Sequence, residues 1–194
     1  ASVLHQHLVG RYDYRVVTKS LPSVPLLEAV MSHTNTQRLM VFHQPFLNLI
    51  ANELPNTDVL LGKPMPVAAA ARFYQQHRTT QFDARHQLQW LVDSPVRLMQ
   101  YAELGRQRGE LMLINLELDV GLHRGGIKSE EQLAVALDII EREPFLQFSG
   151  FMGYDPHVSK NPGLLGGAEA AFSAVQKTYQ NFVTIAERQL QRSL

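Results

Sequence analysis

The chain has 194 residues, of which 45% are hydrophobic and 19% are charged. This composition is typical of a folded globular domain and excludes a disordered chain. The 18 basic and 18 acidic side chains cancel, so no overall field favours binding to nucleic acid or to a membrane. The chain has no cysteine, which excludes disulfides, thiolate metal sites and a cysteine nucleophile.

Neither a membrane span nor an export signal is visible. Every apolar run is shorter than the ~18 residues that a spanning helix needs. Residues 1–10 lack the basic flank and the apolar stretch of a signal peptide. The absence of cysteine is also compatible with a reducing compartment. We therefore expect a soluble, cytoplasmic protein.

Strand and helix patterns alternate along the whole chain. The strands begin about 27 residues apart on average, which is the size of a βα unit. No low-complexity segment or Pro/Ser-rich linker interrupts them, so residues 1–194 are predicted to be one domain. The predicted strands are Arg15–Lys19, Leu39–His43, Asp58–Leu61, Leu88–Asp93, Leu111–Val120 and Phe148–Tyr154.

The intervening helices carry local start signals. Ser94-Pro95 is typical of a cap followed by proline in the first turn. Ser129 and Gln132 form a capping-box pattern. Six such alternations predict a parallel sheet flanked by helices. A full (β/α)₈ barrel needs ~250 residues, so the chain is either a complete open α/β sheet or a barrel without its last two units.

One predicted strand carries a polar row. Asn115, Glu117 and Asp119 share one face of the strand that ends near Val120, because alternate residues of a strand point the same way. A parallel strand that is buried on both faces should be apolar on both. The row is therefore either a polar layer satisfied by neighbouring strands or the floor of a functional site.

Charged and polar side chains gather at or beyond the carboxyl ends of the predicted strands, the edge where α/β ligand sites form. They are Lys19, His43, Asp93, Arg124 and Tyr154. Lys19 is notable because a desolvated lysine at such an edge suits Schiff-base chemistry. The alternatives are that Lys19 only reaches solvent, or that Lys63, which also ends a strand, has the role.

Two glycine-containing segments follow the later strands. DVGLHRGG at residues 119–126 matches neither a P-loop nor a GxGxxG pattern. There, Gly121 can relieve a turn and Arg124 offers a planar cation. GFMGYDPH at residues 150–157 has two glycines within a strand pattern, which indicates close approach of another group to the backbone.

Three of these segments together resemble a known family. YRVVTKS, LELDVGLHRGGI and GFMGYDPHV, in that order and spacing, are similar to the alanine racemase-type barrel of fold-type III pyridoxal-phosphate enzymes. The subgroup they resemble is that of D-threonine aldolase and D-serine dehydratase-like proteins. The resemblance runs from about residue 12 to the last helix and implies a (β/α)₈ TIM barrel, here with about six βα units.

The resemblance also implies roles for individual residues. Lys19 matches the first-strand lysine that holds the cofactor as an internal aldimine, and Arg124 matches the arginine that contacts the phenolic oxygen of the cofactor. Tyr154 lies where the sixth strand presents a His or Tyr beside the cofactor ring. His157 is near positions with acid/base or metal roles in relatives. The implied catalytic residues are thus Lys19, Tyr154 and His157, and the cofactor contacts are Lys19, Arg124 and Tyr154.

The sequence departs from the family pattern in its later part. The family barrel has eight strands, phosphate-binding loops on its late strands, and a following β-rich domain that in this subgroup helps to form a divalent-metal site. We expect the chain to be the N-terminal barrel portion of a longer protein, or an inactive fragment, without that C-terminal domain. The eight histidines are scattered and predict no metal site here. The resemblance implies a homodimer for the full-length protein.

The predicted function is that of a pyridoxal-phosphate-dependent aldolase, dehydratase or racemase acting on D-amino or β-hydroxy amino acids. Its expected partner is a small-molecule amino-acid substrate. One alternative is a non-catalytic pyridoxal-phosphate carrier that consists of a single barrel. Another is an unrelated open α/β protein in which Lys19 is merely structural.

Overall fold

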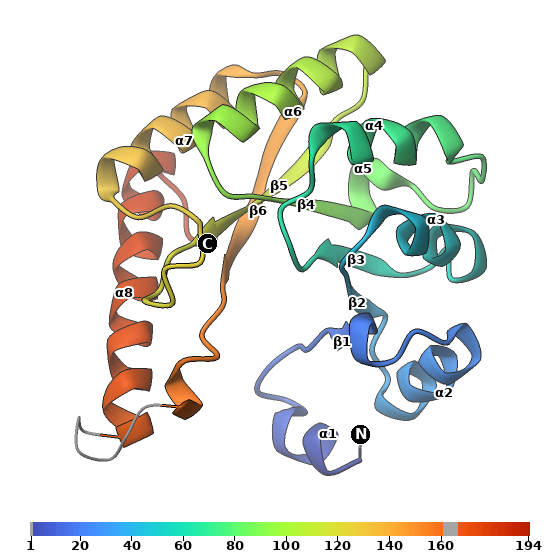
Figure 1. The fold of residues 1–194 in the computed structure, drawn as a ribbon, viewed down its shortest axis with the longest axis horizontal. Helices are drawn as coiled ribbons and strands as arrows, with labels where there is room; N and C mark the ends of the chain where they lie inside the picture. Colours follow the sequence, from blue (N-terminus) through green and yellow to red (C-terminus); the bar gives the residue numbers. More distant parts are fainter. Residues whose placement is uncertain (1, 161–166) are drawn as a thin grey trace. The chain divides into compact units, whose positions relative to one another are not determined.

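The computed structural model describes residues 2–160 and 167–194. Their contacts divide the chain into two compact units, with the boundary between Trp90 and Leu91. The described residues form six strands, and within each unit the strands pair in parallel in chain order, β1-β2-β3-β4 in the first unit and β5-β6 in the second (Figure 1).

The first unit contains a short parallel sheet with helices along one side of it (Figure 1). Its elements are α1 (Ser2–Leu8), β1 (Val16–Val17), the 3₁₀ helix η1 (Thr18–Ser20), α2 (Val24–Thr34), β2 (Arg38–Val41), α3 (Gln44–Glu53), β3 (Asp58–Leu61), α4 (Val67–Gln76), α5 (Ala84–Gln87) and the start of β4 (Leu88–Val92). Val17 lies beside Met40, and Met40 beside Leu60. Three consecutive strands therefore end at one edge.

An aromatic cluster holds α4 against β4 in the first unit. Phe73, Tyr74 and Trp90 are all buried, and the Phe73 and Trp90 rings meet edge to face with their centroids 5.9 Å apart. Trp90 Nε1 donates a hydrogen bond of 3.1 Å to Tyr74 Oη. The polar atoms of two large apolar side chains thus satisfy each other inside the core.

The second unit is built on the pair β5 (Met112–Leu118) and β6 (Leu146–Gly153). Its helices are α6 (Pro95–Arg108), α7 (Glu130–Arg142), the 3₁₀ helix η2 (Val158–Lys160) and α8 (Gly167–Leu190). Every residue of β5 is buried. The register of the pair shifts between Ile114 and Asn115, so that Ile114 lies opposite Phe148 and Asn115 opposite Gly150.

The helix caps that the sequence predicts are confirmed. Ser94 Oγ accepts from Arg97 N at 3.4 Å and Ser129 Oγ accepts from Gln132 N at 3.3 Å. The predicted strand Asp58–Leu61 is β3 with the same bounds. No helix in the described ranges is both long enough and apolar enough to cross a membrane.

The predicted strand Arg15–Lys19 is wrong in its extent. The strand pairs only at Val16 and Val17, and Lys19 lies in the 3₁₀ turn that follows. The strand pairing ends at Thr18, because its side-chain hydroxyl donates to the Met40 carbonyl at 3.1 Å. The backbone then turns, and Leu21 N donates to Thr18 O at 3.0 Å.

Candidate functional site

In the first unit, the candidate lysine lies directly beyond the carboxyl end of its strand. Lys19 belongs to η1 and its residue is exposed. Its Nζ lies 4.6 Å from the centroid of the Phe42 ring, which is within the range of a cation–π contact. Phe42 follows β2 directly, so the neighbouring strand supplies the surface under the lysine.

The competing lysine lies at the same edge. Lys63 is exposed and follows Gly62, which comes immediately after β3. His43, another predicted strand-end residue, begins α3, and its Nδ1 accepts from Phe46 N at 3.3 Å. The prediction that polar groups gather at the carboxyl ends of these strands is therefore confirmed for Lys19, His43 and Lys63.

In the second unit, Arg124 and Tyr154 are brought together. The Arg124 guanidinium carbon lies 4.3 Å from the centroid of the Tyr154 ring, so the loop after β5 meets the residue after β6. Arg124 Nη2 also pairs with Glu117 Oε1. The Glu117 side chain is only 4% exposed, whereas that of Arg124 is 33% exposed. A buried carboxylate thus orients a guanidinium that still reaches the surface.

The carboxylate of Asp119 organises the loop after β5. Asp119 Oδ1 accepts from Gly121 N at 3.1 Å and His123 N at 2.9 Å, and Oδ2 lies 2.9 Å from His123 Nδ1. Burial raises the pKa of Asp119, but the hydrogen bonds from the His123 ring and from the two backbone amides outweigh it, and the pKa is lowered overall. Asp119 is therefore held as a carboxylate that fixes the loop.

Two residues of the predicted polar row, Glu117 and Asp119, have side-chain partners close by in the chain. Glu117 and Asp119 are satisfied mainly by Arg124 and His123, which belong to the loop that follows the same strand. Asn115 is 5% exposed, and its Nδ2 lies 3.2 Å from the point that a Cβ on Gly150 would occupy. The close approach that the glycines of β6 predict is therefore observed at Gly150.

His157 packs against the same loop. Its Nε2 lies 3.2 Å from where a Cβ on Gly121 would be, so the ring fills the space that the glycine leaves. His157 Nδ1 is buried and has no hydrogen-bond partner among the residues that the structure describes. His157 therefore lies beside the loop that carries Arg124, and both residues belong to the second unit. Lys19 and the Phe42 ring that it contacts belong to the first unit.

Sequence reasoning missed two residues of this site, Phe42 and Gly62, and the direct pairing of Glu117 with Arg124. In the sequence, Phe42 resembles any apolar residue at the end of a strand, and Gly62 resembles a turn residue before Pro64. The signal that could have found them is the spacing: Phe42 follows β2, which pairs with the strand before Lys19, and Gly62 follows β3, which pairs with β2.

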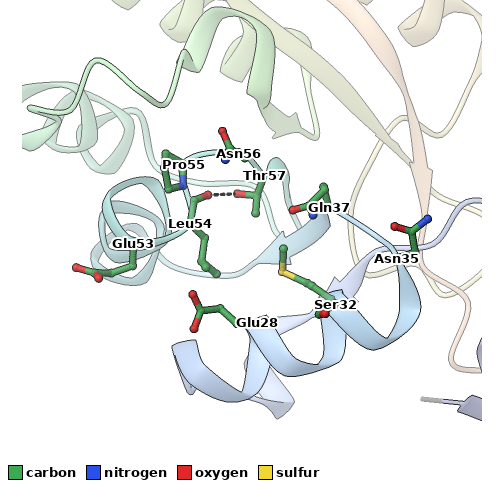
Figure 2. A pocket seen from close by; sticks show the side chains of 10 residues that line it. Glu28, Ser32, Asn35, Gln37, Glu53, Leu54, Pro55, Asn56 and Thr57 are labelled. Atoms are coloured by element: carbon green, nitrogen blue, oxygen red, sulfur yellow. Dashed lines mark hydrogen bonds between the residues drawn. The ribbon is translucent and has the colours of Figure 1, made fainter.

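One cavity of the first unit lies away from the edge of Lys19. It measures about 440 Å³ and is lined by α2, by the segments that precede β2 and β3, and by the end of α3, including Glu28, Gln37 and Glu53 (Figure 2). Thr57 Oγ1 donates to Leu54 O at 2.8 Å within its wall. This cavity opens at the amino ends of β2 and β3, opposite the edge of Lys19. Among the described residues, no group of three or more His, Asp or Glu side chains could hold a metal ion.

Comparison with known proteins gives a family. Residues 62–193 match the family described as "Alanine racemase, N-terminal domain"; this range includes Arg124, Tyr154 and His157, and Lys19 precedes it. No curated protein matches the sequence significantly.

Solved structures resemble the chain over most of its length. D-threo-3-hydroxyaspartate dehydratase from Delftia sp. HT23 superposes with a TM-score of 0.68 and 19% identity, covering 91% of this chain and 44% of that one. Alanine racemase from Oenococcus oeni superposes with a TM-score of 0.72 and 13% identity, covering 94% of this chain and 49% of that one. Histidine racemase from Leuconostoc mesenteroides subsp. sake superposes with a TM-score of 0.68 and 13% identity, covering 88% of this chain and 44% of that one.

The chain spans less than half the length of each of these three proteins. At such identities the likeness establishes the fold, and it confirms the expected incomplete (β/α) barrel of the alanine racemase type. The family match covers more than half of the chain, which excludes an unrelated α/β protein. The chain belongs to the alanine racemase N-terminal domain family.

Proposed function

We propose that this chain is the cofactor-binding barrel portion of a pyridoxal-phosphate-dependent amino-acid enzyme. The reaction is a racemisation, dehydration or aldol cleavage of a D-amino or β-hydroxy amino acid. Family membership supports the class of chemistry, and the resemblance of the three motifs to the D-threonine aldolase and D-serine dehydratase subgroup supports the substrate class.

The observation that carries the proposal is the position of Lys19. It follows the carboxyl end of β1, its residue is exposed, and its ammonium lies on the Phe42 ring. Sites of barrel enzymes form at this edge, and a lysine amine condenses with aldehydes when it is deprotonated. These features support Lys19 as the residue that would hold the aldehyde of pyridoxal phosphate.

The chemistry of the second unit also fits this cofactor. Arg124 has five N–H donors, of which Nη2 is engaged by Glu117, so the remaining donors suit a phenolic oxygen anion. The Tyr154 ring already lies against this guanidinium and offers an aromatic surface. Arg124 and Tyr154 would therefore contact the cofactor, and Glu117 would keep the guanidinium in place.

When bound, pyridoxal phosphate supplies an electron sink for the pair that remains on the substrate α-carbon. Lys19 Nζ would move a proton on one face of the substrate α-carbon, as a general base when it is a neutral amine and as a general acid when it is protonated. Arg124 would stabilise negative charge on the phenolic oxygen. His157 is proposed as a second acid/base group beside the sixth strand.

Covalent trapping tests the identity of the lysine. The chain is incubated with pyridoxal phosphate, reduced with borohydride, and digested for peptide mass mapping. We expect the pyridoxyl group on Lys19 in preference to the other four lysines. Lys19→Ala should abolish this adduct and Lys63→Ala should leave it. An adduct chiefly on Lys63, or one spread evenly over all lysines, would contradict the proposal.

Turnover separates the enzyme from a non-catalytic carrier. The loaded protein is incubated with D-amino acids and β-hydroxy amino acids, and the products are assayed for the opposite enantiomer, a keto acid or an aldehyde. Product that depends on Lys19 supports the enzyme. A specific Lys19 adduct without any turnover would favour the carrier.

A further inference from the structure

The Phe42 ring is the surface on which Lys19 lies, and it is not an ordinary core side chain. Phe42 is half-buried at the end of β2, and the Lys19 ammonium lies 4.6 Å from its centroid. A ring face attracts a cation at this distance because of its quadrupole. The ring therefore both shields one side of the amine and limits where the long lysine side chain can go.

Gly62 determines where that ring lies. A Cβ added to Gly62 would be 2.5 Å from Cε1 of Phe42, closer still to its Cζ, and 2.8 Å from Cγ of Met40. Real Cβ atoms do not make such approaches, so any side chain at this position would push the ring away. The ring thus occupies the space that the missing side chain leaves.

The backbone around this arrangement is fixed on both sides. Gly62 N donates to Val41 O at 2.8 Å, next to Phe42. On the other side, the buried Thr18 hydroxyl donates to Met40 O at 3.1 Å and anchors the turn that carries Lys19. The lysine backbone and the supporting ring are therefore both held by β2, which leaves the lysine side chain few positions.

We propose that Phe42 and Gly62 are positioning residues for Lys19: the ring holds the amine at the carboxyl edge of β1, and the glycine keeps the ring under it. The inference rests on the proposed function for its chemical consequence, the capture of an aldehyde. A lysine that is already confined loses less rotamer freedom when its amine condenses with a bound aldehyde.

Three variants and a control test the arrangement. Phe42→Leu removes the ring, Gly62→Ala displaces it, and Phe42→Tyr retains it. Gly105→Ala is the control, because its Cβ would also be crowded, at 2.8 Å from Cβ of Phe145, but it lies in the second unit and does not touch the surroundings of Lys19. Circular dichroism and urea unfolding show whether each variant folds.

The first readout needs no cofactor. The lysines are reductively methylated with isotope-labelled formaldehyde, and the Lys19 signal is assigned with Lys19→Arg. A methylated amine above a ring face has an upfield-shifted NMR signal. We expect that shift in the unsubstituted chain, in Phe42→Tyr and in Gly105→Ala, and its loss in Phe42→Leu and Gly62→Ala. An unshifted signal in the unsubstituted chain would overturn the inference.

The second readout is trapping of pyridoxal phosphate with borohydride, with the exposed Lys177 on α8 as internal reference. At subsaturating cofactor, the ratio of Lys19 to Lys177 adduct should fall about two- to fivefold in Phe42→Leu and Gly62→Ala, because the amine is then less confined, and it should recover in Phe42→Tyr. Adding Gly62→Ala to Phe42→Leu should lower it little further, because the clashing ring is gone. An unchanged ratio in both single variants would overturn the inference.

The two readouts separate the inference from the function on which it rests. If the methyl signal behaves as expected but pyridoxal phosphate does not select Lys19 in the unsubstituted chain, the proposed function fails and the positioning of Lys19 stands. If pyridoxal phosphate selects Lys19 equally in all variants, the function stands and the positioning role fails.

Discussion

The Arg124 guanidinium carbon lies 4.3 Å from the centroid of the Tyr154 ring, so a cation–π contact joins the segments that follow β5 and β6. The same guanidinium pairs with Glu117, which lies on β5 itself. Arg124 is therefore fixed from two directions, by a buried carboxylate and by an aromatic face, and each contact can be tested alone.

The contact between Arg124 and Tyr154 predicts a coupling energy. We expect this from a double-mutant cycle of Arg124→Met and Tyr154→Leu. The double variant should lose less free energy of unfolding than the sum of the two single losses, by about 0.5–1 kcal/mol. Urea unfolding measures this difference. With Tyr154→Phe, which keeps the ring, the coupling to Arg124 should persist. Strictly additive losses in the first cycle would show that the contact contributes nothing.

The buried carboxylate of Glu117 predicts a larger effect. Glu117→Gln keeps the shape of the side chain but removes the charge that pairs with Arg124. Because the Glu117 side chain is 4% exposed, we expect the free energy of unfolding to fall by about 1–3 kcal/mol. Urea unfolding at neutral pH checks this.

An exposed ion pair serves as the control for that measurement. Asp138 and Arg142 pair at 2.8 Å on α7, with side chains that are 46% and 77% exposed. Asp138→Asn should change the free energy of unfolding by less than about 0.5 kcal/mol. Equal losses in Glu117→Gln and Asp138→Asn would contradict a special role for the buried pair.

The lowered pKa of Asp119 predicts the behaviour of the chain in acid. Although burial raises this pKa, hydrogen bonds from His123 and Gly121 lower it overall. Its carboxylate therefore contributes stability above the unfolded-state pKa of about 3.9, and that contribution is lost as the pH falls through the folded-state pKa. When the pH is lowered below about 4, the urea concentration at the midpoint of unfolding should decrease. It should decrease less steeply for Asp119→Asn. The same decrease of the urea midpoint with pH in Asp119→Asn and in the unsubstituted chain would exclude this contribution.

The features that the sequence predicts well are those with local causes. The alternation of strands and helices, the caps at Ser94 and Ser129, and the bounds of β3 all follow from spacing and capping chemistry within a few residues. The edge that carries Lys19 follows from the same alternation, because the carboxyl ends of parallel strands lie together.

The features that the sequence does not reveal depend on contacts across strands. The end of β1 is set by the hydrogen bond from Thr18 to Met40, which no spacing predicts. The pairing of Glu117 with Arg124 requires the loop after β5 to fold back onto its own strand. The place of Phe42 depends on Gly62, which follows a different strand. Such residues have no periodic pattern, and only the fold brings them together.

Two adjacent glycines in the loop after β5 predict opposite outcomes. Gly126 has a φ of +94°, and an added Cβ would lie 2.8 Å from Glu117 O and 3.0 Å from Asp119 N. Both atoms are backbone, and hydrogen bonds of 2.8 Å and 2.9 Å between Ile127 and the end of β5 hold them in place. At Gly125 a Cβ would meet nothing within 4 Å.

We therefore expect Gly126→Ala to lower the free energy of unfolding by about 2–4 kcal/mol, since it adds backbone strain to a steric clash. Gly125→Ala should be neutral or stabilise the chain by up to about 1 kcal/mol, because alanine reduces the freedom of the unfolded state. Urea unfolding of the two variants side by side gives the comparison. Because Gly126 lets the loop return to β5, its substitution should also remove the coupling between Arg124 and Tyr154, whereas Gly125→Ala should preserve it. Similar losses at both glycines would mean that the fold of this loop does not depend on the close approach at Gly126.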